Sequence, residues 1–326
     1  MAKNEYRPRI SEALPTATTS FETQNTRLAG VMGTLEQGIE SVLSDEGFAA
    51  YLRMLAKFHD YSYANTILIM TQRSDASRVN SYNRWKELGR QVVKGEAGIK
   101  IFYPKRQNVD DPETGEKKFA LIGFGVGNVF DITQTEGEPL PERPSIVESE
   151  APDEQSRQLN IKMSQWLIDE GLRLESKQFP GNAKGFYLPT GAQKAIVIRR
   201  GEAVDPMNVA KTKTLVHEAA HYVADHAPTL PKGDVETVAE SSAFVVMARF
   251  GLDTGAYSFP YVAGWAKNTD VLKRNLSEIQ KVSHKLISAI EGVADPSEGE
   301  EPPAPGRFLE EDEHLALRER LEWEGP

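Results

Sequence analysis

Residues 212–226 read TKTLVHEAAHYVADH, and this stretch decides the fold of the C-terminal half of the chain. Its apolar residues recur at helical spacing, and it contains the pattern H-E-x-x-H from His217 through Glu218 to His221. On a helix, residues four positions apart lie on one face, so both imidazoles could bind one zinc ion. Glu218 stands beside the first of them, where its carboxylate could act as a general base.

The pattern is common, and two helical histidines can equally be ordinary core or surface residues. A catalytic zinc ion needs a third protein ligand. His226 is unsuitable because it follows His221 by five positions, which turns it about 140° around the helix. We interpret His226 as a residue near the C-terminal end of the helix that favours the helix dipole.

The next predicted helix offers a better third ligand. Glu236 and Glu240 are four residues apart in ETVAESSAFVV (236–246), so they share one face beside apolar residues. We predict that Glu236 binds the zinc ion and that Glu240 holds a ligand histidine in the correct tautomer. The opposite assignment, in which Glu240 binds the zinc ion and Glu236 orients the histidine, stays open. Such a centre would catalyse hydrolysis, with an amide as the default substrate.

Composition limits the remaining functions. The chain has 326 residues, no cysteine and a formal net charge of −10. Without cysteine it can form no disulfide, thiolate zinc site or cysteine nucleophile, which fits a reducing cytoplasm. The first residues lack an apolar signal region, and no run is long enough to span a bilayer, so no membrane partner is expected.

The charge is unevenly distributed. Residues 291–326 hold twelve acidic and three basic side chains, whereas residues 78–106 hold eight basic and two acidic ones. In the basic segment and just before it, lysines and arginines alternate with aromatic residues. Basic groups neutralise phosphates and aromatic rings stack on unpaired bases, so this part suits single-stranded DNA. The same composition also fits aromatic residues in a core beneath a solvated basic face.

A Pro- and Glu-rich segment at 137–156 predicts a linker between two domains, and the fold class we expect is α+β. Residues 1–30 are interpreted as a flexible arm, and residues 293–326 as an acidic, largely disordered tail. The first domain, 31–136, should contain helices at 35–57, 61–72 and 81–88 and strands at 99–103 and 119–132. The second, 157–292, should contain helices at 157–174, 207–226, 234–250 and 268–292 and strands at 185–187 and 195–198.

Three blocks of the first domain resemble one known family. They are YSYANTILIMTQ (61–72), WKELGRQVVKGEAGIKI (85–101) and VFDITQTEG (129–137). In this order they resemble the N-terminal domain of ArdC-type antirestriction proteins, over about residues 35–137. The E-x-x-A-E spacing from Glu236 to Glu240 is similar to the second site helix in the zincin-like metallopeptidase domain of that family.

The resemblance implies a bacterial cytoplasmic protein of a plasmid or phage that protects incoming DNA from restriction. It would bind single-stranded DNA and carry a zinc metallopeptidase-like domain that acts on a protein substrate. Two alternatives stay open: a protective DNA-binding protein with a structural or vestigial zinc site, and a regulatory peptidase that cuts a repressor. The predicted DNA contacts are Tyr61, Asn65, Arg84, Trp85, Arg90, Lys94 and Lys100.

Overall fold

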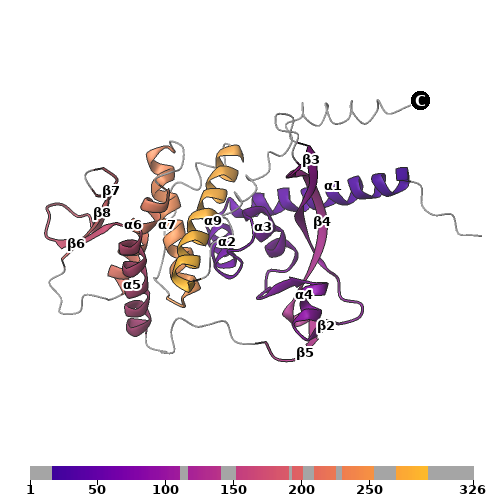
Figure 1. Cartoon of the computed structure of the whole chain (residues 1–326), viewed down its shortest axis with the longest axis horizontal. Coiled ribbons are helices and arrows are strands. Elements are labelled where there is room, and N and C mark those ends of the chain that lie inside the picture. Colours follow the sequence, from indigo (N-terminus) through magenta and orange to yellow (C-terminus); the bar gives the residue numbers. More distant parts are fainter. Residues whose placement is uncertain are drawn as a thin grey trace, which may run out of the picture.

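The computed structural model describes residues 17–110, 117–140, 152–190, 193–200, 209–224, 230–252 and 269–292 (Figure 1). Helices and small sheets are mixed along these ranges, so the predicted α+β class is confirmed. The predicted acidic tail and the interpretation of His226 lie outside the described residues. No helix in the described ranges is long and apolar enough to cross a membrane.

The N-terminal part begins with helices α1 (Ala17–Val42), α2 (Asp45–Lys57) and α3 (Tyr63–Gln72). The single helix predicted over 35–57 is therefore wrong. Ser44 ends the first helical run, because its hydroxyl accepts the N–H of Gly47 and caps a new helix, whose first turn carries Asp45 and Glu46.

Helix α1 also corrects the flexible arm expected over residues 1–30, since residues 17–30 are helical. The physical reason is that no proline follows Pro15 in this stretch, so nothing in the backbone interrupts the helix. Among the residues of α1 whose burial the structure describes, Arg27 and Gly30 are exposed and Val31 is the first buried one.

A three-stranded antiparallel sheet follows, with the strand order β1-β4-β3. Its strands are β1 (Val79–Ser81), β3 (Ile99–Asp110) and β4 (Lys117–Asp131), and helix α4 (Tyr82–Glu87) follows β1. Strands β2 (Arg90–Val92) and β5 (Thr135–Gly137) form a separate pair. Strand β3 continues beyond the predicted end at Tyr103, because β3 lies at the edge of the sheet, where Pro104 is tolerated.

Helix α3 lies against the free edge of β3 and bonds to its backbone through two side-chain amides. Asn65 donates to the carbonyl of Phe102 and accepts from its N–H, both at 2.9 Å. Gln72 makes the same pair of bonds with Lys100, at 2.8 and 2.9 Å. These bonds fix α3 to the sheet.

The C-terminal part contains helices α5 (Pro152–Asp169), α6 (Val209–Ala224), α7 (Lys232–Arg249) and α9 (Thr269–Glu291). Its sheet has the order β6-β8-β7, from β6 (Arg173–Lys177), β7 (Gly185–Leu188) and β8 (Ala195–Arg199). The helix predicted over 157–174 ends early, because Gly171 adopts a φ of +84° and turns the chain into β6, which pairs in parallel with β8.

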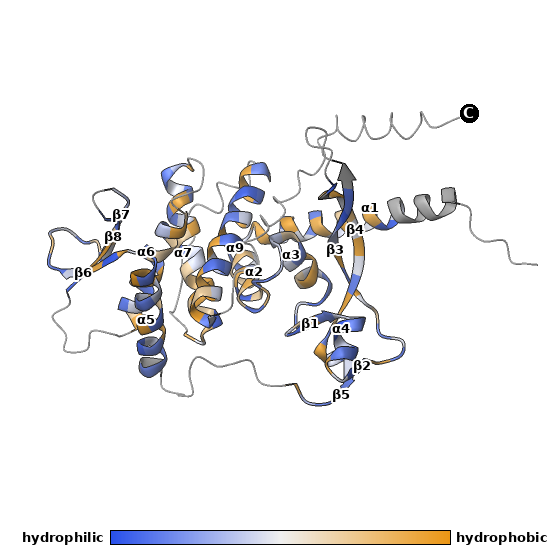
Figure 2. Ribbon diagram, in the orientation of Figure 1, coloured by the Kyte–Doolittle hydropathy of each residue, from blue (hydrophilic) through white to orange (hydrophobic). Residues whose placement is uncertain are grey.

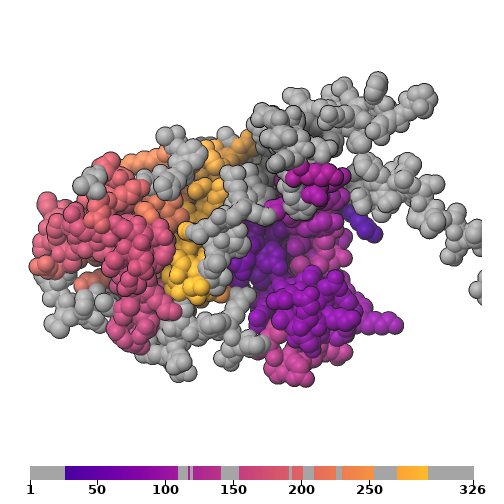
Figure 3. Space-filling model, in the orientation of Figure 1, coloured from indigo at the N-terminus to yellow at the C-terminus, as the bar shows by residue number. Residues whose placement is uncertain are grey.

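One hydrophobic core joins the two parts. It contains Phe48 and Leu52 of α2 together with Val246 of α7 and Leu286 of α9. Helix α2 packs against α7, and α3 contacts α9. Apolar and polar residues alternate along α9 (Figure 2), and its apolar residues Leu276 and Ile287 are fully buried. In the space-filling view α9 lies between the two parts (Figure 3). The two parts are therefore held together by side-chain packing.

Candidate metal centre

The two histidines of the H-E-x-x-H pattern lie one turn apart on α6. Their Nε2 atoms are 3.1 Å apart, and both side chains are largely buried. The opposite side of α6 is anchored in the core by apolar residues, among them Leu215 and Ala219. The burial of that side turns both imidazoles toward α7.

Helix α7 packs against α6 and places Glu236 opposite the histidines. Its Oε2 lies 3.6 Å from the Nε2 of His217 and 3.6 Å from the Nε2 of His221. Four-coordinate zinc with ligands at about 2.0–2.1 Å requires ligand atoms about 3.3–3.4 Å apart. His217, His221 and Glu236, which we call the first cluster, therefore fit a metal ion in both donor type and spacing.

A second carboxylate lies behind the first cluster. Oε2 of Glu240 is 3.2 Å from Nδ1 of His217, and its other oxygen is 2.6 Å from Nζ of Lys213. A carboxylate on the far nitrogen fixes the orientation of a ligand imidazole. Lys213 was not among the predicted site residues, although its position four residues before His217 places it on the same face of α6.

The carboxylates dominate the electrostatics of the first cluster. Burial lowers the pKa of His217, but Glu236 and Glu240 outweigh it and raise this pKa to about 9. The hydrogen bonds from both histidines hold the pKa of Glu236 far below its usual range. In the absence of a metal ion the cluster thus attracts a proton, and it would favour any cation of suitable size.

The environment of Glu218 differs from that of Glu236 and Glu240. Its side chain is buried, and burial raises its pKa above the usual value, although a backbone hydrogen bond from Tyr187 opposes the shift. Glu218 and the first cluster line one cavity of about 1140 Å³, which strand β7 borders through Phe186 and Tyr187. The arrangement brings a carboxylate, a metal-binding cluster and a sheet edge to the same space.

Three of the predicted DNA contacts are buried or hydrogen-bonded within the fold. Trp85 is fully buried, and its Nε1 donates to the carbonyl of Phe130 at 2.8 Å, so its prediction as a base-stacking residue is wrong. The reason is that α4 turns this ring toward β4. The guanidinium group of Arg90 donates hydrogen bonds to Thr135 and to the carbonyls of residues 137 and 138. Asn65 bonds to β3 as described above.

Other members of the predicted set are accessible. Arg84, Lys94 and Lys100 are exposed, and Tyr61 is partly buried. A cavity of about 380 Å³ is lined by basic and aromatic side chains, including Lys57, Tyr61, Arg78 and Arg84. Lys57 was not among the predicted DNA contacts, because it lies within the amphipathic pattern of α2.

The fold and the first cluster define an α+β protein with a helix-borne His-His-Glu group that could hold a metal ion. Residues 23–130 match the family model for the N-terminal domain of the anti-restriction factor ArdC. Residues 23–130 are thus similar to that domain, and the predicted resemblance is confirmed over residues 35–130.

The chain is also similar to the uncharacterized protein pXO2-81 of Bacillus anthracis, with 26% identity over 290 residues. The match covers 77% of this chain and 48% of the relative, so the chain spans about half the length of that protein.

Two crystal structures of the antirestriction protein ArdC from plasmid R388 are similar as well. The metal-free one has 20% identity and a TM-score of 0.45, covering 71% of this chain and 86% of that one. The Mn(II)-bound one has 19% identity and a TM-score of 0.48, covering 80% and 97%.

Proposed function

We propose that this chain is an antirestriction-type protein of a mobile element that binds single-stranded DNA and carries a zinc metallopeptidase-like centre. The observation that supports the second half of this proposal is the first cluster itself. Two imidazole nitrogens and one carboxylate oxygen lie at the spacing of zinc ligands, on the wall of a cavity that also contains Glu218. The ArdC-type N-terminal domain supports the first half.

His217, His221 and Glu236 would hold the ion, and Glu240 would orient the imidazole of His217. Two nitrogen donors and one oxygen donor suit Zn²⁺, although the relative from plasmid R388 was crystallised with Mn(II). A bound zinc ion would supply Lewis acidity that polarises the carbonyl of an amide substrate.

Glu218 would act as the general base and then as the general acid. It lies beside His217 and lines the same cavity, so its carboxylate can accept a proton from the attacking water and return it to the leaving amine. The backbone N–H of Tyr187 bonds to this carboxylate and helps to fix its position. Strand β7 is an edge strand of its sheet, and an extended peptide could pair with it across the cavity.

The decisive experiment for the centre compares the wild-type chain with Glu218→Gln. This variant should keep one equivalent of zinc at the first cluster but lose hydrolysis of an unfolded test protein such as casein. Glu278→Gln is the matched control, because Glu278 lies on α9 and is also partly buried. Turnover that survives in Glu218→Gln would refute the role of Glu218. Absence of turnover in the wild-type protein would contradict the peptidase half of the proposal.

DNA binding is tested through its dependence on salt. The affinity for an oligonucleotide should fall steeply as salt rises, because bound phosphates release counterions. The slope of log affinity against log salt is negative, and Lys94→Ala and Lys100→Ala should each make it shallower by about 0.7. Lys232→Ala, an exposed lysine of α7, is the control and should leave the slope unchanged. Binding that is independent of salt would rule out this interface.

A further inference from the structure

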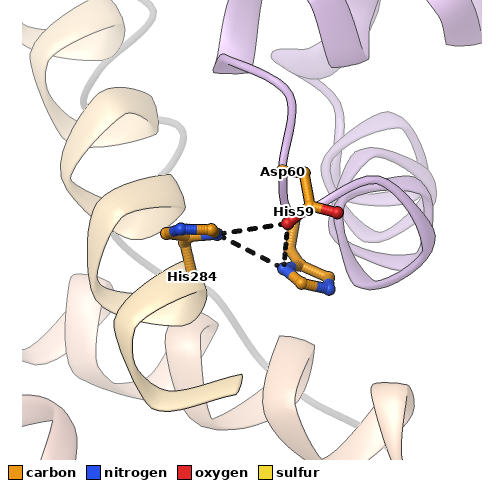
Figure 4. Close-up of side chains that lie close together, drawn as sticks. All are labelled: His59, Asp60 and His284. Atoms are coloured by element: carbon orange, nitrogen blue, oxygen red, sulfur yellow. Dashed lines mark hydrogen bonds and ion pairs between the residues drawn. The ribbon is translucent and has the colours of Figure 1, made fainter. Parts of the chain in front are cut away.

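A second cluster of metal-binding side chains lies where the N-terminal part meets α9. His59 and Asp60 follow the end of α2, and His284 projects from the middle of α9 toward them (Figure 4). One atom from each side chain, the two Nδ1 nitrogens and Oδ1 of Asp60, lies within 4.8 Å of the other two. We call these three residues the second cluster.

The distances within the second cluster have the spacing of metal ligands. Nδ1 of His59 is 3.4 Å from Nδ1 of His284 and 3.3 Å from Oδ1 of Asp60. Oδ1 of Asp60 is 3.6 Å from Nδ1 of His284. Tetrahedral zinc requires ligand atoms about 3.3–3.4 Å apart. Direct N–H···O hydrogen bonds are about 2.7–3.2 Å long, so ordinary hydrogen bonding describes these contacts less well.

The surroundings of the second cluster also suit a metal ion. His59 is only 3% exposed, so its imidazole is held within the packed boundary between the two parts. The side chain of Asp60 is 71% exposed, which leaves one side open for ion entry and for a water ligand. The nearby charges of Arg249 and Glu291 are already paired with each other at 2.5 Å.

The fold holds the second cluster in place from both sides. Gln280, one turn before His284 on α9, donates from Nε2 to the carbonyl oxygen of His59 at 3.0 Å. On the other side, the N–H of Tyr61 bonds to the carbonyl oxygen of Phe58 at 2.9 Å and closes the turn that carries His59 and Asp60. The cluster is thus built from a fixed turn and a fixed helix.

We propose that His59, Asp60 and His284 form a second zinc site, which fastens the ArdC-type N-terminal part to α9. The site is structural, because it joins residues 225 positions apart at the boundary between the two parts. A bound ion would stabilise the folded chain, in which the three ligands lie together, relative to the unfolded chain, in which they do not. The proposal is independent of the peptidase chemistry at the first cluster.

Metal content of the full-length protein tests the proposal. The wild-type chain should bind two zinc ions, whereas Asp60→Asn and His284→Gln should each bind one. Asp60 is exposed, so its replacement should leave the fold intact. Asp75→Asn is the matched control, because Asp75 is equally exposed in the same part of the chain, and it should keep two ions. Two ions in both Asp60→Asn and His284→Gln would overturn the proposal.

A second measurement separates this site from the first cluster. His217→Gln should still bind one zinc ion, and zinc should raise its Tm. The double variant His217→Gln with Asp60→Asn should bind at least tenfold more weakly and lose the rise in Tm. An identical rise in both variants would show that the second cluster does not hold the ion. If His217→Gln alone abolished all zinc binding, the second site would be refuted while the first remained.

Discussion

Replacing Glu240 should weaken zinc binding at the first cluster without abolishing it. Loss of a carboxylate behind a ligand histidine typically lowers metal affinity about 10- to 100-fold, or about 1.4–2.8 kcal/mol. Glu240→Gln keeps an oxygen that can face the Nδ1–H of His217, now 3.2 Å from the carboxylate, so the loss should fall near tenfold. Glu240→Ala removes this acceptor and leaves Lys213 without its 2.6 Å partner, so its loss should approach 100-fold.

Replacing Glu236 should have a larger effect, because its oxygen lies 3.6 Å from both Nε2 atoms and would touch the ion itself. The assay is a competition titration of zinc against a chromophoric chelator, made in the Asp60→Asn background so that only the first cluster is measured. Glu278→Gln serves again as the control. If Glu240→Gln were more damaging than Glu236→Gln, the two glutamates would have the opposite roles and our assignment would be refuted.

Three other outcomes follow from the described contacts. Trp85→Phe should lower the free energy of unfolding by about 1–3 kcal/mol in urea, since it removes the bond to Phe130 and leaves a small cavity. Asp131 accepts the backbone N–H groups of residues 77 and 78, and despite burial these bonds lower its pKa. The advantage of the wild type over Asp131→Asn should be complete above about pH 4 and shrink as pH falls through the lowered pKa. Zinc affinity of the metal-free chain should rise up to about pH 9, as His217 must lose its proton, and calorimetry in two buffers should detect that proton. An unchanged unfolding midpoint of Trp85→Phe would contradict the first expectation. A stability difference between wild type and Asp131→Asn that does not depend on pH would contradict the second. A zinc affinity that does not change with pH would contradict the third.

The first cluster could be predicted from sequence because its geometry is local to two helices. The spacing of His217 and His221 fixes their common face, and the same spacing of Glu236 and Glu240 within apolar residues predicts a face turned inward. What sequence could not supply was the packing of α7 on α6. That packing decides which glutamate faces Nε2 and which faces Nδ1, and it is why the opposite assignment had to stay open.

Elsewhere the predictions fell short for one local reason and two long-range ones. The break at Ser44 depends on one capping hydroxyl within an otherwise continuous apolar pattern. An aromatic residue in a basic segment can face solvent or the core, and only the pairing of β1 with β4 settles that Trp85 is buried. The second cluster unites positions far apart in the chain, so no local spacing could reveal it.

The amide bonds between α3 and β3 have a consequence for how the protein behaves at high concentration. An uncovered edge strand presents free N–H and C=O groups on which a strand from another molecule can add, and such addition leads to aggregation. At Lys100 and Phe102 both groups are occupied by the amides of Gln72 and Asn65. An incoming strand would have to displace four hydrogen bonds and the helix that supplies them, so this stretch of the sheet resists growth from one molecule into the next.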